Sequence, residues 1–333
     1  TEIYTLSLHD ALPIYTVFTA ALKRNTIDIG LIAPDGTQVG ASGSDKSLVI
    51  VSETAATPGY HPCPIVEGEW MVIVGAYKVA PEGVDVRYEI TLTRKSLKLL
   101  KGDLHVHSIN SDGVHTLEEL AFKAKANGLD FLAITDHNQL VSADSLPKLA
   151  GVTMIPGVEW THYQGHANFL GVSEPYDGPF FTNTDEEFVD KFNSARDRGA
   201  VIVINHPFEE GSSFLFDIQS MPFDCLEVWN GPMRESNLRA VGLWHQMLLQ
   251  GLRVPICGGS DYHRDTPFIF LGGPTMCLYS MSAGASDLLY ALRSGHGYVS
   301  FAPGGPELKM TAGDGMMGDE VEWEITRDRK SVV

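Results

Sequence analysis

Two histidines, His105 and His107, stand one residue apart at the end of an apolar run in the stretch KGDLHVHSINSDG, residues 101–113. Side chains two positions apart in a β-strand point to the same side, so a strand here would direct both imidazoles at one point. Imidazole is a common ligand of Zn²⁺ and other transition metals. The pair is therefore a candidate metal-binding element, although chance can also place two histidines this way.

Further histidines and carboxylates stand at the ends of other short apolar runs. These are His137 in AITDH, Glu159 in IPGVE, His166 in HANFLG, His206 in VINH, and Asp261 and His263 after PICGGS. The C-terminal ends of parallel strands meet at one rim of an α/β sheet or barrel, so six of the 12 histidines would converge there. A set of His, Asp and Glu without cysteine suits Zn²⁺, Mn²⁺ or Fe²⁺ and argues against copper or an iron–sulfur cluster.

Strands alternate with helices after about residue 103, which is the arrangement needed to position such a rim. Thr116 and Glu119 form a T-x-x-E capping box, which predicts that a helix begins there, and Gly128 stands where this helix would end. Further helices are predicted over residues 185–198 and 238–250. The pattern predicts an α/β fold over residues 103–310, with a parallel sheet that closes into a (β/α) barrel or stays open.

The flanking regions have a different composition. Residues 15–94 contain short alternating strands separated by turn signals such as Pro34-Asp35-Gly36, which predicts a small all-β sandwich or jelly roll. Residues 95–102 are a basic linker, and residues 311–333 form a C-terminal segment. The stretches LSLHDALPI and RDRKSVV resemble translated sequencing adapters. We therefore expect residues 1–14 and the end of the chain to be non-native and exclude them from the fold argument.

Composition narrows the classes of partner. The chain of 333 residues has 24 Lys and Arg against 42 Asp and Glu, a net charge of −18, which disfavours a nucleic-acid backbone as the partner. No apolar run approaches the ~20 residues of a membrane span, so no membrane partner is expected. Serine-hydrolase, Walker and dinucleotide motifs are all lacking. A cytoplasmic location is slightly favoured, and secretion stays open because a native N-terminus could be missing.

Taken in order, the motifs DLHVHSINSDG, AITDHN, PGVEWT, GHANFLG, INHP and GGSDYHR resemble those of the PHP (polymerase and histidinol phosphatase) metal-dependent hydrolases. The resemblance covers about residues 101–301, and GDLHVHS, WN and GSDYHR are most similar to the carbaryl-hydrolase branch. It implies a distorted seven-stranded (β/α) barrel with two to three divalent cations (Zn, Mn or Fe) at its C-terminal rim.

The resemblance also implies which residues hold the cations. The first would be bound by His105, His107, Glu159 and Asp261. Glu159 would bridge to a second, completed by His166 and His206, and Asp112, His137 and His263 would hold a third. Asp112 matches least well, because some members use histidine there and the spacing shifts by one. His162 is an alternative to His166 if the strand register differs.

The expected reaction is hydrolysis by a metal-bridging hydroxide, with phosphoesters of small, anionic molecules as the first choice of substrate. Asp261 or His263 would shuttle the proton, and Arg264 would clamp an anionic oxygen unless it only pairs with a surface carboxylate. Two alternatives stay open. The same centre could hydrolyse carboxylic esters or carbamates, or the chain could be a metal-free binding module.

Overall fold

The computed structural model of the chain describes residues 2–8, 14–18, 25–43, 46, 48–52, 56–92 and 96–322. The predicted non-native end RDRKSVV lies outside these residues. The chain divides into two compact units. The first comprises residues 1–98 with 148–153 and 281–287, and the second comprises residues 99–147, 154–280 and 288–333.

The first unit contains two antiparallel sheets. One has the order β1 (Glu2–Leu8), β6 (Gly68–Lys78), β3 (Thr26–Ile32), β4 (Gln38–Ser42), and the other the order β5 (Leu48–Val51), β2 (Ile14–Phe18), β7 (Tyr88–Leu92). Strand β1 lies in the stretch that we excluded from the fold argument, and its backbone pairs with β6. Alternate residues of β3 and β6 are buried, as expected for a strand with one face on a core, and they join Val49 and Val51 of β5 in one apolar cluster.

The second unit contains two five-stranded sheets. The first has the order β10 (Thr153–Ile155), β9 (Phe131–Ala133), β8 (Lys98–Asp103), β16 (Thr275–Ser280), β17 (Gly297–Ser300). The second has the order β11 (Gly157–His162), β12 (Gly165–Leu170), β13 (Val201–Ile204), β14 (Cys225–Asn230), β15 (Ile256–Gly259). Strand β8 begins within the stretch predicted to be a linker.

These sheets are mixed, so the prediction of a wholly parallel sheet is wrong. Strands β8 and β9, β13 and β14, and β14 and β15 pair in parallel, whereas β11 and β12, β12 and β13, and β16 and β17 pair antiparallel. The physical reason is plain for β11 and β12. Only Tyr163 and Gln164 separate them, and a connection this short permits a hairpin but no crossover.

The sheets are open, and no closed barrel is detected among the described residues. Two isolated parallel bridges connect them at their ends, one between Val106 and Tyr262 and the other between His137 and Glu159.

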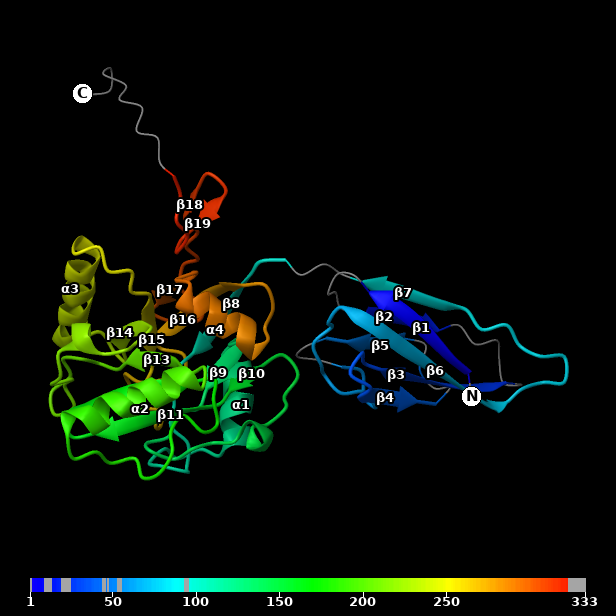
Figure 1. Cartoon of the computed structure of the whole chain (residues 1–333), viewed down its shortest axis with the longest axis horizontal. Helices are drawn as coiled ribbons and strands as arrows, with labels where there is room; N and C mark the ends of the chain where they lie inside the picture. Colours follow the sequence, from blue (N-terminus) through cyan, green and yellow to red (C-terminus); the bar gives the residue numbers. More distant parts are fainter. Residues whose placement is uncertain are drawn as a thin grey trace, which may run out of the picture. The chain divides into compact units, whose positions relative to one another are not determined.

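Helices cover individual strands of the second unit. Helix α1 (Leu117–Ala126) contacts β9, α2 (Asp185–Asp197) contacts β13, and α3 (Glu235–Leu249) contacts β14 (Figure 1). The capping box of α1 is confirmed, because the Thr116 hydroxyl accepts from the backbone N–H of Glu119 and the Glu119 carboxylate accepts from that of Thr116. Gly128, just beyond the helix, has φ +76°. The predicted helices over 185–198 and 238–250 are confirmed as α2 and α3.

The remaining elements are short. They are α4 (Ala285–Arg293), the 3₁₀ helices Ala143–Ser145 and Ile218–Ser220, and the hairpin β18 (Thr311–Ala312) and β19 (Gly315–Met316). No helix in the described part of the chain has the length and apolar character needed to cross a membrane.

An aromatic core fixes β11 and β12 against α2. Trp160 is fully buried, and its ring meets that of Phe188 edge to face at 4.7 Å between centroids. Phe169 and Phe192 continue this cluster. Burial of such large rings makes β11 a rigid support for the polar side chains on its other face.

Candidate metal centre

The structure brings all nine sequence-predicted metal ligands together. They form four overlapping groups, and the candidate ligand atoms within each group lie within 4.8 Å of one another. The groups are His107, Asp112, His137 and His263; His105, His107 and Glu159; His105, His206 and Asp261; and His137, Glu159 and His166. Because the groups share members, the nine residues make one continuous cluster. Their division among individual cations stays a prediction.

Glu159 lies at the centre of this cluster. It belongs to β11, its side chain is fully buried, and five imidazoles surround its two oxygens. The nitrogens of His105, His166 and His206 lie 3.3, 3.0 and 3.3 Å from Oε1. Those of His107 and His137 lie 3.4 and 2.8 Å from Oε2. A carboxylate so placed can bridge two cations.

Two further carboxylates complete the cluster on its more exposed side. Asp261 Oδ1 lies 3.0 Å from Nε2 of His107 and 3.5 Å from Nε2 of His105. Asp112 Oδ1 lies 3.1 Å from Nε2 of His263, and its Oδ2 lies 3.8 Å from Nε2 of His137. The Asp112 side chain is 57% exposed, so this edge of the cluster is open to solvent.

Unusual backbone conformations accompany these residues. His206 has φ +22° and Asp261 has φ +52°, in the left-handed region that residues with a Cβ rarely adopt. Hydrogen bonds hold the strand ends in place. The backbone N–H of His107 donates to the carbonyl of Tyr262 at 2.9 Å, and that of Tyr262 donates to the carbonyl of His105 at 3.3 Å. Strain of this kind collects at functional sites, where the surrounding structure maintains it.

The carboxylates shift the protonation of the imidazoles. Burial opposes a charge on His105, but Asp261, Glu227 and Glu159 outweigh burial and raise its pKa well above the usual 6.5. The pKa values of His137 and His206 are also raised, against burial, chiefly by Glu159. Burial opposes ionisation of Glu159 and Asp261 as well, yet the neighbouring histidines lower both pKa values. Without a cation, protons retained on these histidines therefore balance the negative charges of the carboxylates.

The donor set fits divalent cations. Six buried side-chain polar atoms of the cluster have no hydrogen-bond partner among the described residues. The six are His105 Nε2, His107 Nδ1 and Nε2, Glu159 Oε2, His206 Nδ1 and Asp261 Oδ1. An unpaired buried polar atom is costly, so their collection at one place indicates that something else satisfies them. Imidazole nitrogens and carboxylate oxygens are the ligands of Zn²⁺, Mn²⁺ and Fe²⁺.

Sequence reasoning missed the residues that support the ligands. Glu227 accepts a hydrogen bond from His105, Asn205 donates to Glu159 Oε1 at 2.9 Å, and Asp136 accepts from the N–H and hydroxyl of Ser108, next to His107. The side chains of Glu227, Asn205, Asp136 and Ser108 are all buried. A signal was present for Glu227, which is a carboxylate flanked by apolar residues inside the strand CLEVWN.

The alternative ligand His162 lies outside the cluster. In the β11–β12 hairpin His166 pairs with Thr161, which shares a strand face with Glu159, whereas His162 shares the face of Trp160. The His162 ring stacks on Trp160 with centroids 5.3 Å apart, and burial lowers its pKa. The register of the hairpin therefore places His166 on the face of Glu159 and His162 on the opposite face, which the sequence alone left open. Arg264 follows His263 directly, is exposed, and makes no ion pair with the described residues.

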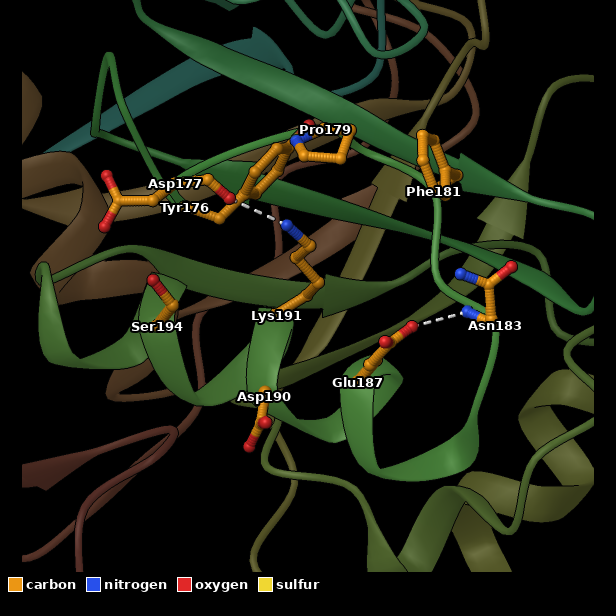
Figure 2. Close-up of a pocket in the computed structure, with 9 residues that line it drawn as sticks. All are labelled: Tyr176, Asp177, Pro179, Phe181, Asn183, Glu187, Asp190, Lys191 and Ser194. Carbon is orange, nitrogen blue, oxygen red and sulfur yellow. Dashed lines mark hydrogen bonds between the residues drawn. The ribbon is translucent and has the colours of Figure 1, made fainter.

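Two hollows in the second unit contain none of the nine residues. One of about 370 Å³ lies beside α2, where the Lys191 ammonium donates to the carbonyl of Asp177 and lies over the Tyr176 ring (Figure 2). The other, of about 290 Å³, lies at the start of α3, where Arg234 pairs with Glu209. Neither hollow contains one of the groups of close candidate metal ligands, so the cluster is the candidate reaction site.

Part of the second unit matches a known protein family. Residues 103–204 match the model of the PHP domain family. A 5′-3′ exoribonuclease of Haemophilus influenzae is 41% identical over 69 residues, which are 20% of this chain and 25% of that protein. A phosphoribosyl 1,2-cyclic phosphate 1,2-diphosphodiesterase of Eggerthella lenta is 37% identical over 81 residues, 22% of this chain and 31% of that protein. The matches thus span less than a third of either relative.

Among solved structures, a two-domain protein of Bacteroides vulgatus described as containing a predicted PHP-like metal-dependent phosphoesterase is similar to this chain. The TM-score is 0.49 with 22% sequence identity, and the alignment covers 66% of this chain and 70% of that one.

Proposed function

We propose that this chain, which carries a PHP domain over residues 103–204, is a metal-dependent hydrolase of phosphoesters. The observation that carries the proposal is the convergence of six partnerless buried nitrogens and oxygens around Glu159. Divalent cations would satisfy them.

In this proposal the nine residues would hold up to three cations. His105, His107, Glu159 and Asp261 would hold a first cation, Glu159 with His166 and His206 would hold a second, and Asp112, His137 and His263 would hold a third. When bound, two or three Zn, Mn or Fe ions supply an activated water and neutralise charge on the oxygens of the ester.

His263 is the better placed proton carrier. Its Nδ1 lies 2.9 Å from the backbone carbonyl of Asp261, and because a carbonyl only accepts, Nδ1 carries the proton of that bond. Nε2 then carries the lone pair of the ring beside Asp112, at the solvent-exposed edge of the cluster, so His263 can take up a proton there only when it does not hold the third cation. Asp261 is the alternative carrier, since its Oδ1 faces His107 inside the cluster.

We also propose that the two sheets of the second unit form a distorted barrel. The isolated bridges support this, since Val106 with Tyr262 and His137 with Glu159 join the ends of one sheet to those of the other. The two antiparallel sheets of the first unit share one apolar cluster, which supports a β-sandwich there.

A carboxylic ester or carbamate is the second candidate substrate class, which is the chemistry of the carbaryl-hydrolase branch. The observation in its favour is that, among the described residues, Arg264 alone stands next to a predicted ligand in the sequence with its guanidinium outside any ion pair. Arg234 is already paired with Glu209. A phosphate dianion gains most from an unpaired guanidinium.

A panel of substrates distinguishes these classes. The full chain, loaded with Mn²⁺ or Zn²⁺, is assayed with p-nitrophenyl phosphate, bis-p-nitrophenyl phosphate, p-nitrophenyl acetate and 1-naphthyl N-methylcarbamate. Turnover of either phosphate ester supports the proposal, and the bis ester reports phosphodiesterase activity. Turnover of the acetate or carbamate alone favours the second candidate. Elemental analysis giving well under one ion per chain would instead favour a metal-free binding module.

A further inference from the structure

Glu227 is a buried carboxylate that belongs to none of the groups of candidate metal ligands. It lies in β14 and is 1% exposed. Its Oε1 lies 2.9 Å from Nδ1 of His105, and its Oε2 accepts the backbone N–H of His206 at 2.8 Å. One side chain therefore contacts two of the predicted ligands, which are far apart in the sequence.

The contact with His105 determines which ring nitrogen carries the proton. An ionised carboxylate only accepts hydrogen bonds, so Nδ1 of His105 must be the donor. Nε2 then has a free lone pair in the neutral ring. This same Nε2 lies 3.3 Å from Glu159 and 3.5 Å from Asp261, and it is one of the partnerless buried atoms.

The contact with His206 stabilises an unfavourable backbone. His206 has φ +22°, and the bond from its N–H to Glu227 holds the chain there. Glu227 Oε2 also accepts from Nδ2 of Asn230 at 3.3 Å, and the same Nδ2 lies 3.3 Å from Oδ2 of Asp261. The contacts of Glu227 thus extend to a third predicted ligand.

We infer that Glu227 is a positioning residue that fixes the Nδ1–H tautomer of His105 and the backbone of His206 for metal binding. The inference rests on the proposed metal-dependent function, and it names a residue beyond the nine ligands. Carboxylate partners of ligand histidines commonly account for about 10- to 100-fold in metal affinity.

Glu227→Gln tests the inference with little change in shape. The amide has one accepting oxygen where the carboxylate has two, so either His105 or His206 must face an NH₂ group. If it is His105, Nδ1 must accept and the proton moves to Nε2, which can then no longer bind a metal. Zn²⁺ affinity is measured on the full chain by chelator competition, and we expect it to fall by about 10- to 100-fold.

Asp224→Asn is the matched control. Asp224 stands just before the same strand, at the opposite end from the cluster, and accepts a backbone N–H from Ile202 at 2.8 Å. This change also replaces a carboxylate that accepts a backbone N–H by an amide; Asp224 is partly buried and pairs with Arg293, but it contacts no predicted ligand. We expect its Zn²⁺ affinity to equal that of the wild type.

Long-range ¹H–¹⁵N spectra of ¹⁵N-histidine in the Zn²⁺-loaded wild type supply a readout that needs no variant. We expect His105 to be protonated at Nδ1, and an Nε2–H tautomer would overturn the inference. Equal Zn²⁺ affinity in the wild type and Glu227→Gln would overturn the positioning role of Glu227 and leave the proposed function intact. A wild-type chain that binds no divalent cation would overturn the proposed function first, and this inference with it.

Discussion

Glu159 is the residue on which most of the site depends. Its carboxylate is fully buried, and the imidazoles around it come from β11's neighbours and from strand ends elsewhere in the second unit. A charged group in such a place is stable only if positive charge, from protons or from a cation, surrounds it.

Glu159→Ala should remove metal content and turnover together, because it deletes the oxygens shared by both predicted cation positions. The loss of affinity should exceed the ~10- to 100-fold typical of losing only a partner of a ligand. Elemental analysis and the ester assays measure both quantities on one preparation. Activity that persisted in this variant would rule out the bridging role.

Metal affinity should increase as the pH rises above 6.5. His105, His137 and His206 have raised pKa values, so at neutral pH they keep protons that a cation must displace. Chelator competition over about pH 6 to 9 measures this dependence. An affinity independent of pH over that range would contradict the shifts.

The same groups set the stability of the metal-free chain. A raised histidine pKa stabilises the folded state below the unfolded value of 6.5, and this contribution is lost as the pH rises through the folded pKa. The lowered pKa values of Glu159 and Asp261 stabilise the fold above their usual values of 4.5 and 3.8, and that contribution is lost in acid. We expect the Tm of the metal-free chain to decrease above neutral pH, and added Zn²⁺ to restore it.

Arg264→Ala distinguishes a substrate clamp from a surface charge. If the guanidinium binds a phosphoryl oxygen, kcat/KM for a phosphate ester should fall by about 10-fold, the value of one charged hydrogen bond of ~1.5 kcal/mol. Turnover of p-nitrophenyl acetate should not change. Arg253→Ala is the control, because Arg253 is also exposed but lies before β15 and pairs with Glu320. Equal effects of Arg264→Ala and Arg253→Ala on kcat/KM would contradict a role of Arg264 in binding the substrate.

At the scale of elements, the strands position the ligands by close packing of backbones. Strand β15 ends in two glycines, Gly258 and Gly259. A Cβ at Gly259 would lie 2.4 Å from the Cβ of His105 and 3.2 Å from Glu227 Oε1. Only glycine allows β15 to approach His105 this closely.

Gly259→Ala should therefore displace His105 and weaken Zn²⁺ binding by at least ~10-fold. Chelator competition measures the affinity, and thermal unfolding measures the accompanying loss of stability. Gly242→Ala is the control, because Gly242 lies in α3 and an added Cβ would meet no atom within 4 Å outside the adjoining backbone of the helix. It should leave affinity unchanged and stabilise the helix by up to ~1 kcal/mol. Unchanged affinity in Gly259→Ala would show that the strand can move without affecting the site.

At the scale of the whole molecule, the two units have separate apolar cores. The core of the first unit involves Trp70 and its neighbours in β3, β5 and β6, whereas Trp160 and the phenylalanines of α2 belong to the second. All nine predicted ligands lie in the second unit.

Deleting residues 1–95, just before β8, should leave the metal stoichiometry of the remaining chain unchanged. The deletion removes no predicted ligand, although it removes most of the first unit, to which residues 148–153 and 281–287 also belong. Elemental analysis of the truncated and full chains makes the comparison. A truncated chain that folds, as judged by circular dichroism, but binds no metal would contradict the assignment of the site to the second unit alone.

The sequence by itself determined the local features and the set of residues that we predict as metal ligands. The capping box of α1, the positions of α2 and α3, and the histidines and carboxylates at strand ends all follow from patterns a few residues long. Such patterns reflect local geometry, in which side chains repeat every two residues in a strand and every 3.6 in a helix. The resemblance to the PHP family added Asp112 and the division of the predicted ligands among the cations.

Only the tertiary structure decided the pairing of strands and the partners of each ligand. The antiparallel β11–β12 register selected His166 over His162, and Glu227 met His105 across 122 residues of sequence. These contacts depend on which backbones lie side by side, and local spacing carries no information about a neighbour so distant in the chain. Packing of the whole second unit, through close approaches such as Gly259 on His105, is the physical reason that the site has this geometry.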